Sequence, residues 1–174
     1  MSIEFLEAAL PGLVAQRLRD PRRIDWEVLF GRLGTRLPDD YIILAQSYPR
    51  LEIGQFLTVT APVPGYEEGF VESVKMDLEG AEEMSQKGMT GDYPVFPAPG
   101  GLLRWGSSID GDEFHWRTQG QPNEWTVVVA GRNDDWSHHE GTLTSYLASL
   151  CSGTIPPYGL PPNFPGPDPA LSVG

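Results

Sequence analysis

The chain has 174 residues and a formal net charge of −12, with 24 Asp and Glu against 12 Lys and Arg. That length suits one domain, or one domain and a tail, and the 40% of apolar residues can form a sizeable core. The acidic balance argues against a nucleic-acid partner, because such binders present a basic face to phosphates, and equally against an anionic membrane surface.

The N-terminal part of the chain is predicted to be helical. Residues 3–20 carry leucines spaced near the helical period, although Pro11 interrupts them. Asp25 is a favourable N-cap for a short helix through residues 26–33, and Gly34 is placed to end it. These signals predict at least two helices before the first strand.

The middle of the chain alternates between helix and strand signals. A helix is predicted to begin at Pro38 and to stop before Pro49. Residues 51–60 are rich in apolar and β-branched side chains, which predicts one strand. Residues 66–87 contain no proline and form a weak apolar stripe on an acidic segment, so we expect a helix there, and residues 92–101 form a proline-rich connector.

Four short runs then predict strands, at residues 102–107, 113–118, 125–130 and 135–139. Asp110-Gly111 between the first two is a strong hairpin signal, and the other connections are equally short. Such connections predict an antiparallel meander. Thr142 or Thr144 can cap a last helix that Gly153 ends.

Together these elements predict an α+β fold, with a mostly antiparallel meander flanked by N-terminal helices and a C-terminal helix. We expect one domain over residues 1–152. Residues 154–174 contain seven of the 17 prolines and few side chains able to build a core. Residues 153–174 are therefore predicted to form a flexible, partly polyproline-like tail.

Cysteine usage and the N-terminal residues bear on location. Cys151 is the only cysteine, which excludes an internal disulfide bond and a zinc ribbon. Residues 1–13 contain no basic side chain, so the positive start of a secretory signal is not visible. No apolar run approaches about 18 residues, so we expect no membrane span and a cytoplasmic protein.

The negative charge is unevenly distributed. Residues 1–60 carry a balance of −1 and residues 61–174 a balance of −11. Most of the excess lies in two stretches, residues 67–92 and residues 110–140. One interpretation is a solvated surface kept soluble by like charge, and the other is an acidic surface that steers a basic protein toward itself.

No catalytic, cofactor or metal site is predicted. His138 and His139 lie near several carboxylates, but neighbours on a strand point to opposite faces and do not readily bind one ion. Cys151, beside leucines of the last predicted helix, is explained as a small core residue. Neither a nucleophile elbow nor a phosphate-binding loop is present, so an enzyme is the least favoured hypothesis.

The order of several short motifs resembles one known family. Its opening is similar to residues 26–34, WEVLFGRLG, followed by residues 37–41, LPDDY. The central strands and their glycine turn are similar to LRWG at 103–106, DGD at 110–112, FHW at 114–116 and WTVVV at 125–129, and TSYL at 144–147 resembles the closing helix. Over residues 24–151 the chain thus resembles the SUKH superfamily, which includes the fungal Smi/Knr-like cell-wall regulators and many bacterial immunity proteins. The acidic segment at 66–92 and the proline-rich tail depart from that pattern.

The resemblance implies an α+β domain whose curved sheet is flanked by helices, and we expect a non-enzymatic protein-binding function. Bacterial members are implied to be immunity proteins that neutralise a cognate polymorphic toxin, often a nuclease or deaminase. An acidic protein suits that role, because it can cover the basic face of a nucleic-acid enzyme. The alternative is a regulatory scaffold in a housekeeping or cell-wall-related complex.

Candidate partner-binding residues follow from the second acidic stretch and its aromatic side chains. Four of the five tryptophans lie in the predicted meander, where core packing is the expectation for most and an exposed one would be an interface anchor. The predicted rim charges and possible anchors are Asp110, Asp112, Glu113, Asp134 and Asp135, with Trp116 and Trp136.

Overall fold

The structure is a computed structural model that describes residues 3–173; residues 1, 2 and 174, which the sequence analysis assigns to the domain and the tail, lie outside the described residues. The helices are α1 (Glu4–Ala9), α2 (Pro11–Val14), α3 (Trp26–Leu33), α4 (Asp39–Ser47), α5 (Glu67–Gln86) and α6 (Leu143–Cys151), with a short 3-10 turn at Pro122–Glu124. The strands are β1 (Leu51–Ile53), β2 (Leu57–Val59), β3 (Leu102–Ser108), β4 (Glu113–Arg117), β5 (Thr126–Gly131), β6 (Asp135–His139) and β7 (Leu171–Val173).

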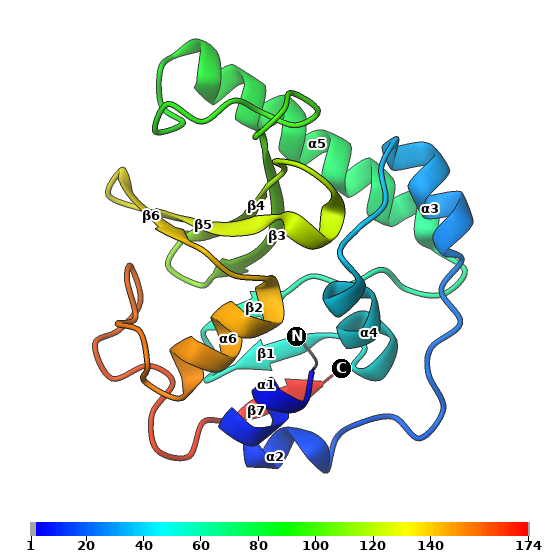
Figure 1. Cartoon of the computed structure of the whole chain (residues 1–174), viewed down its shortest axis with the longest axis vertical. Helices are drawn as coiled ribbons and strands as arrows, with labels where there is room; N and C mark the ends of the chain where they lie inside the picture. The colour runs from blue at the N-terminus through cyan, green and yellow to red at the C-terminus, as the bar shows by residue number, and fades with distance from the viewer. Residues whose placement is uncertain (1–2, 174) are drawn as a thin grey trace.

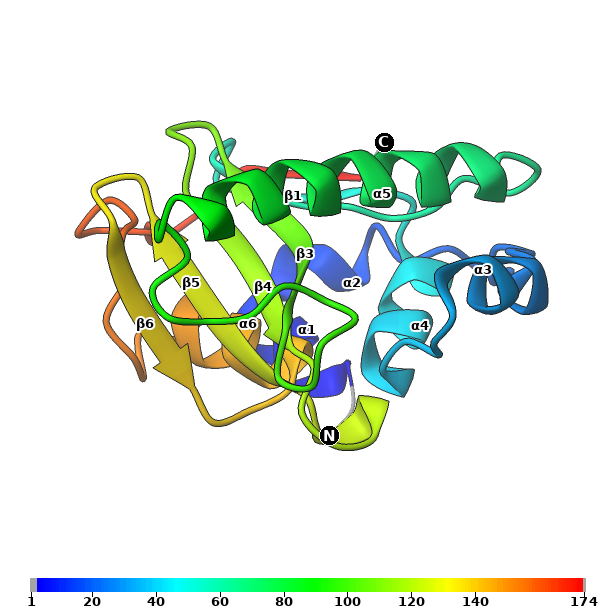
Figure 2. The same cartoon turned by 90° about the horizontal axis from the view of Figure 1, so that it is seen from above.

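The strands form one antiparallel sheet in the order β6-β5-β4-β3-β2-β1-β7 (Figure 1). Strands β1 to β6 are therefore neighbours in chain order, which confirms the predicted α+β class and its meander. The sheet is open and curved. Helix α5 lies across one face, whereas α1 and α6 lie on the other (Figure 2). Within residues 3–173 we find no helix with the length and apolar character needed to cross a membrane.

Local signals set the helix ends much as predicted. The carboxylate of Asp25 accepts a hydrogen bond from the backbone N–H of Val28 at 3.1 Å, and Gly34 ends α3 in the left-handed conformation, with φ of 75°. The helical segment expected over residues 3–20 ends earlier, at Val14, and the interruption expected at Pro11 divides it into α1 and α2. Proline has no N–H to continue the first helix but is favourable at the start of the second.

The prediction of one strand over residues 51–60 was wrong, because the segment is a hairpin of two short strands. The turn between β1 and β2 passes through Gly54 and Gln55, with φ of 64° and 56°. Two successive residues with positive φ match the twist of the flanking strands and reverse the chain tightly. Glycine takes that conformation without strain, and it was the one local sign of the turn.

The C-terminal segment also differs from the prediction. Residues 153–173 do not extend away from a domain that ends at residue 152, but pack along it. Strand β7 pairs antiparallel with β1 and completes that edge of the sheet. Leu160 is buried in the main core, and the ring of Phe164 lies 6.2 Å from that of Phe56. The few apolar side chains suffice because they dock on a surface that the rest of the chain builds.

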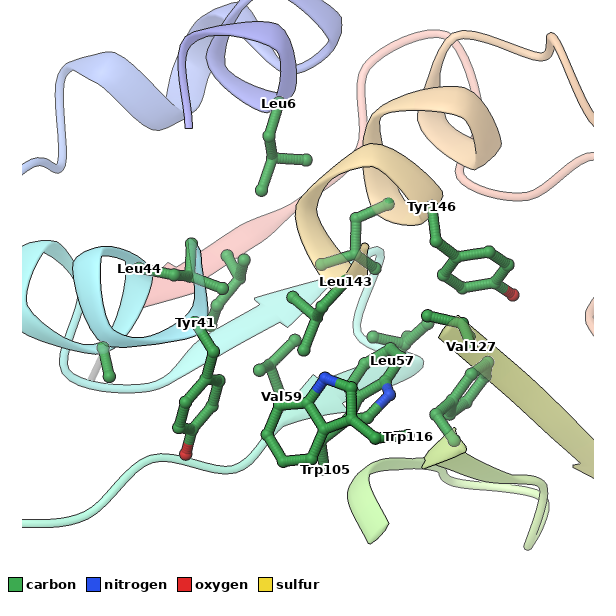
Figure 3. Packing of buried hydrophobic residues seen from close by; sticks show 14 of the residues in the cluster. Leu6, Tyr41, Leu44, Leu57, Val59, Trp105, Trp116, Val127, Leu143 and Tyr146 are labelled. Atoms are coloured by element: carbon green, nitrogen blue, oxygen red, sulfur yellow. The ribbon is translucent and has the colours of Figure 1, made fainter. Parts of the chain in front are cut away.

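The main core lies between the inner face of the sheet and helices α1, α4 and α6 (Figure 3). Trp105 is fully buried and packs against Tyr146 of α6 at 6.2 Å between ring centroids. Tyr41 of α4 meets Trp116 edge to face at 4.9 Å, and its hydroxyl donates a hydrogen bond to the carbonyl of Thr60. These aromatic side chains join the helices to the sheet.

The N-terminus of α6 is capped from another helix. Thr142 occupies the N-cap position, but its side chain makes no capping hydrogen bond among the described residues. Instead, Oδ2 of the buried Asp40 accepts hydrogen bonds from the backbone N–H and the hydroxyl of Thr144, both at 2.9 Å. The acidic side chain satisfies donors that a helix start leaves unpaired and fixes α6 to α4.

Candidate binding groove beneath helix α5

The two faces of the sheet carry different chemistry because side chains alternate along each strand. On β4, Phe114 and Trp116 point into the core, whereas Glu113 and His115 lie on the opposite face. Arg104 of β3 pairs in register with His115 and belongs to that same outer face. Charged side chains are thereby collected on the face that α5 crosses.

Helix α5 is fixed near its start and stands away from the sheet near its end. The Glu67 carboxylate accepts hydrogen bonds from the backbone N–H groups of Asp25 at 3.0 Å and Gly65 at 3.2 Å, and these donors lower the pKa of Glu67. Val71 and Val74 are buried, whereas the later turns present the small residues Gly80 and Ala81. Small side chains leave open space between the helix and the sheet.

A groove of about 570 Å³ occupies that space. Its lining residues come from the second half of α5, the connector from α5 to β3, the outer face of the sheet and the turn between β5 and β6. Figure 2 shows the backbone of these elements, with α5 crossing the sheet. A volume of this size lies within the range of about 300–1,000 Å³ typical of binding pockets.

Trp136 of β6 holds the connector over the sheet. Its ring lies 5.6 Å from that of Tyr93 and packs directly on Gly91. Gly91 has φ of 56°, and a Cβ atom there would lie 2.5 Å from the Trp136 ring. Glycine is needed at this position both for the backbone conformation and for the close approach.

The floor of the groove is an ion-pair cluster around Arg104. Its Nε donates a hydrogen bond to Asp77 Oδ2 at 3.1 Å, and its Nη2 donates one to Asp77 Oδ1. Its Nη1 donates a third hydrogen bond to Glu113 Oε1 at 2.9 Å. Partial burial opposes the charge of Arg104, but the two carboxylates outweigh it and raise its pKa. This geometry, with one bidentate pair, fixes the carboxylates in place.

His115 completes the cluster. Its Nε2 lies 3.4 Å from Glu113 Oε2, and this contact is the largest cause of a lowered pKa at Glu113; partial burial opposes the shift, and the charge of Arg104 adds to it. His115 is buried, at 6% exposure, and its Nδ1 is a buried atom with no hydrogen-bond partner among residues 3–173. With the proton on Nε2, Nδ1 is an unused acceptor.

The walls are apolar and include three methionines. Met76 and Met84 of α5 and Met89 of the connector line the groove and are 71%, 39% and 48% exposed. Exposed apolar side chains gathered around a hollow indicate a contact surface, and methionine adapts its shape to what it contacts.

The groove is negatively charged. Its charged lining residues, four carboxylates and two guanidinium groups, are Asp77, Glu83, Glu113, Asp134, Arg104 and Arg132. With neutral histidine the lining therefore carries a net charge of −2. Both cations are already engaged, because Arg104 binds two carboxylates and Arg132 lies 2.9 Å from Asp110. The arrangement attracts a cation and disfavours an anion.

Three of the predicted partner-binding residues line this groove: Glu113, Asp134 and Trp136. Asp110 lies beside it through its ion pair with Arg132, at the turn between β3 and β4. Strand alternation and turn position bring these residues together, although the sequence analysis treated them only as a general acidic rim.

Two of the predicted site residues are buried, so the prediction that they contact a partner is wrong, and a third is only partly exposed. Asp112 is 1% exposed and accepts hydrogen bonds from Ser108 Oγ and the backbone N–H of Arg132, so it organises the hairpin instead of meeting a partner. Trp116 is 3% exposed and belongs to the core, where aromatic packing buries it. Asp135 is half-buried, and its buried Oδ1 has no hydrogen-bond partner within the described residues.

Six further groove residues were not among the predicted site residues. They are Met76, Asp77 and Met84 of α5, Met89 of the connector, Arg104 of β3 and His115 of β4. The alternation of β3 and β4 was a usable signal for Arg104 and His115, since both lie on the face opposite the aromatic core residues. No local signal indicated that α5 and its methionines would cross this face.

The groups considered for catalysis are separated or unreactive. His138 Nε2 lies 2.7 Å from Thr126 Oγ1, whereas the ring of His139 packs against Tyr146 at 5.3 Å. Across residues 3–173, no group of three or more His, Cys, Asp and Glu side chains is arranged to hold a metal ion. Burial raises the pKa of Cys151 to about 12, so its thiol stays protonated at neutral pH.

Glu113 gives the groove a pH-dependent contribution to stability. Because its folded-state pKa lies below the ordinary value of 4.5, the contribution is present above pH 4.5 and is lost as the pH falls through the lowered pKa. Glu113→Gln should therefore lower the free energy of unfolding by about 1 kcal/mol at pH 7, as expected for a partly exposed pair. Urea unfolding from pH 7 to pH 3 checks this, and a variant deficit that does not shrink toward pH 3 would contradict it.

Comparison with models of known protein families found no match, and neither curated proteins nor solved structures yielded one. The function is therefore inferred from the groove and from the charged residues around it.

Proposed function

We propose that this chain is a non-enzymatic binding protein of the immunity type, which neutralises a basic toxin domain by covering its substrate-binding face. The observation that carries the proposal is the negatively charged, methionine-walled groove beneath α5. The SUKH-like order of motifs supports the same function. A cytoplasmic location is part of the proposal, because a toxin that attacks nucleic acid acts there.

The charge distribution supports a basic partner in particular. A nuclease or deaminase presents cationic side chains to phosphates, and a carboxylate surface meets those side chains directly. Helix α5 and the β5–β6 turn place carboxylates on both sides of the groove, with Glu83 on one wall and Asp134 on the other. The partner would therefore be attracted to the rim of the groove before it makes apolar contacts.

A second candidate is a regulatory scaffold that joins two partners. It is favoured by a second hollow, of about 540 Å³, on the opposite side of the sheet between α1 and α6. Phe5 lines that hollow and is 58% exposed. A scaffold would use both faces, whereas an inhibitor of one toxin needs only the groove.

The test is to mix the purified chain with the toxin domains encoded beside its gene. The proposal expects one of them to form a stoichiometric complex and to lose its activity on nucleic acid in that complex. Recovery of housekeeping proteins alone from a pull-down, with every neighbouring toxin domain unbound and fully active, would favour the scaffold instead.

Charge reversal at the rim should weaken partner binding in a salt-dependent way. The double variant Asp110→Lys, Asp134→Lys is expected to slow association about tenfold at 50 mM salt, because steering by charge acts over a long Debye length. At 500 mM salt the difference should shrink below threefold. Stopped-flow association rates measure it. The matched control is Glu79→Lys, Glu82→Lys on exposed positions of α5; equal slowing in both variants, or no salt dependence, would contradict the rim assignment.

A further inference from the structure

The polar part of the groove offers acceptors and few free donors. Each oxygen of Asp77 and one oxygen of Glu113 receives a single hydrogen bond from Arg104. A carboxylate oxygen can accept about two hydrogen bonds, so these groups keep unused capacity. His115 Nδ1 also has no partner among the described residues, but it is buried, so the accessible acceptors are the carboxylate oxygens of Asp77 and Glu113. The groove is therefore suited to an occupant that brings N–H donors.

The net charge narrows the choice of occupant. The guanidinium of Arg104 is compensated by two carboxylates, and the lining as a whole remains negative. An anionic ligand would meet uncompensated carboxylates, and a neutral one would leave them unpaired. A cation with several N–H donors satisfies both the charge and the hydrogen-bonding capacity.

The apolar walls require the occupant to carry an aliphatic or aromatic part. Met84 and Met89 are exposed to solvent and line the groove, and Trp136 lines it as well. Lysine and arginine combine a long aliphatic stem with a cationic head, and the stem packs on apolar surface while the head stays hydrogen-bonded. The groove volume also leaves room for an apolar neighbour of that side chain.

We propose that the groove receives a basic amphipathic segment of the partner, with a lysine or arginine head near Glu113 and Asp77 and an apolar side chain between the methionines and Trp136. This inference rests on the proposed function in one respect, because it takes the occupant to be part of a basic protein. The rim charges attract the partner, and the groove selects the sequence of its inserted segment.

The first arm of the test uses peptides as probes of the full chain. The probes are a 14-residue amphipathic peptide built of leucine and lysine and its counterpart built of leucine and glutamate, titrated at 150 mM salt in a calorimeter. The wild type is expected to bind the lysine peptide and to leave the glutamate peptide unbound. Ala81→Trp fills the groove without changing its charge, and Glu113→Gln removes one acceptor; each should weaken binding at least tenfold.

The matched control for the second variant is Glu82→Gln, which removes the same charge from an exposed position on α5. It should stay within twofold of the wild type. Equal weakening by Glu82→Gln and Glu113→Gln would show general attraction to an acidic protein and overturn the inference. Full binding by a folded Ala81→Trp would overturn it too. If Ala81→Trp does not fold, the comparison of the two glutamine variants decides alone.

The second arm repeats the variants with the toxin domain identified by the neutralisation test. Weakened toxin binding by both groove variants supports the inference. A toxin that is bound and neutralised equally by the wild type and both groove variants overturns the inference and leaves the proposed function standing. If no neighbouring toxin binds but the peptide arm gives the expected result, the groove assignment stands and the proposed function fails.

Discussion

Replacing Asp40 by alanine is expected to lower the free energy of unfolding by about 3 kcal/mol, the upper end for hydrogen bonds to a charged group. The variant leaves the backbone N–H and hydroxyl of Thr144 without their acceptor inside the protein. A buried donor without a partner costs the full free energy of removing that group from water. The loss of stability should therefore exceed that of an ordinary surface substitution. Helix α6 also loses its attachment to α4, and with it part of the support for the core around Tyr146.

Urea unfolding followed by tryptophan fluorescence measures this loss, which corresponds to a fall in the thermal midpoint of about 6–12 °C. Asp39→Ala is the matched control, because Asp39 is the exposed neighbour and its carboxylate accepts a hydrogen bond from the side chain of Asn123 at the surface. It should change stability by less than about 1 kcal/mol. Asp40→Asn retains an acceptor oxygen and should lose less than Asp40→Ala. A loss equal to that of Asp39→Ala would contradict the capping role.

Deleting residues 154–174 is expected to destabilise the domain by at least about 3 kcal/mol, because each buried Leu, Val or Phe contributes about 1.5–3 kcal/mol. The deletion removes buried Leu160, the contact of Phe164 with Phe56 and the pairing of β7 with β1. The entropy regained by the ordered segment offsets part of that loss. The exposed edge of β1 should also make the shortened chain prone to association.

Differential scanning calorimetry and size-exclusion chromatography check both consequences. The control is the full chain with Asp168→Ala, an exposed position in the same segment, whose stability should be unchanged. Leu160→Ala should reproduce about 2 kcal/mol of the deletion effect. An unfolding midpoint of the shortened chain within 1 °C of the wild type would show that the segment is an inert tail after all.

The meander and α5 could be predicted because their signals are local. Alternating side chains and the Asp110-Gly111 turn identify β3 and β4 within about fifteen residues of sequence. The hairpin at Gly54 was missed because strands of three residues are too short to show a period, and its glycine resembled an interruption within one strand. The strand at β7 was missed for the same reason, and because its partner β1 is distant in sequence.

The groove could be predicted only in part. Acidic turn residues such as Asp134 and an aromatic such as Trp136 stood out by composition. Arg104 and Asp77 are separated by 27 positions and meet only because α5 folds back over β3. Trp116 was misassigned because composition cannot separate the two faces of a strand when both neighbours are large. Strand register, which pairs Arg104 with His115, supplied the missing information.

The central claim is that a basic toxin domain binds the face that carries the groove. Amide hydrogen exchange of the chain, free and in complex with that toxin domain, measures this most directly. We expect slower exchange in residues 79–95, which cover the end of α5 and part of the connector. We also expect it in residues 131–136, at the β5–β6 turn. Exchange in α1 and α6 should stay unchanged. Slower exchange confined to α1 and α6, around Phe5, would contradict it.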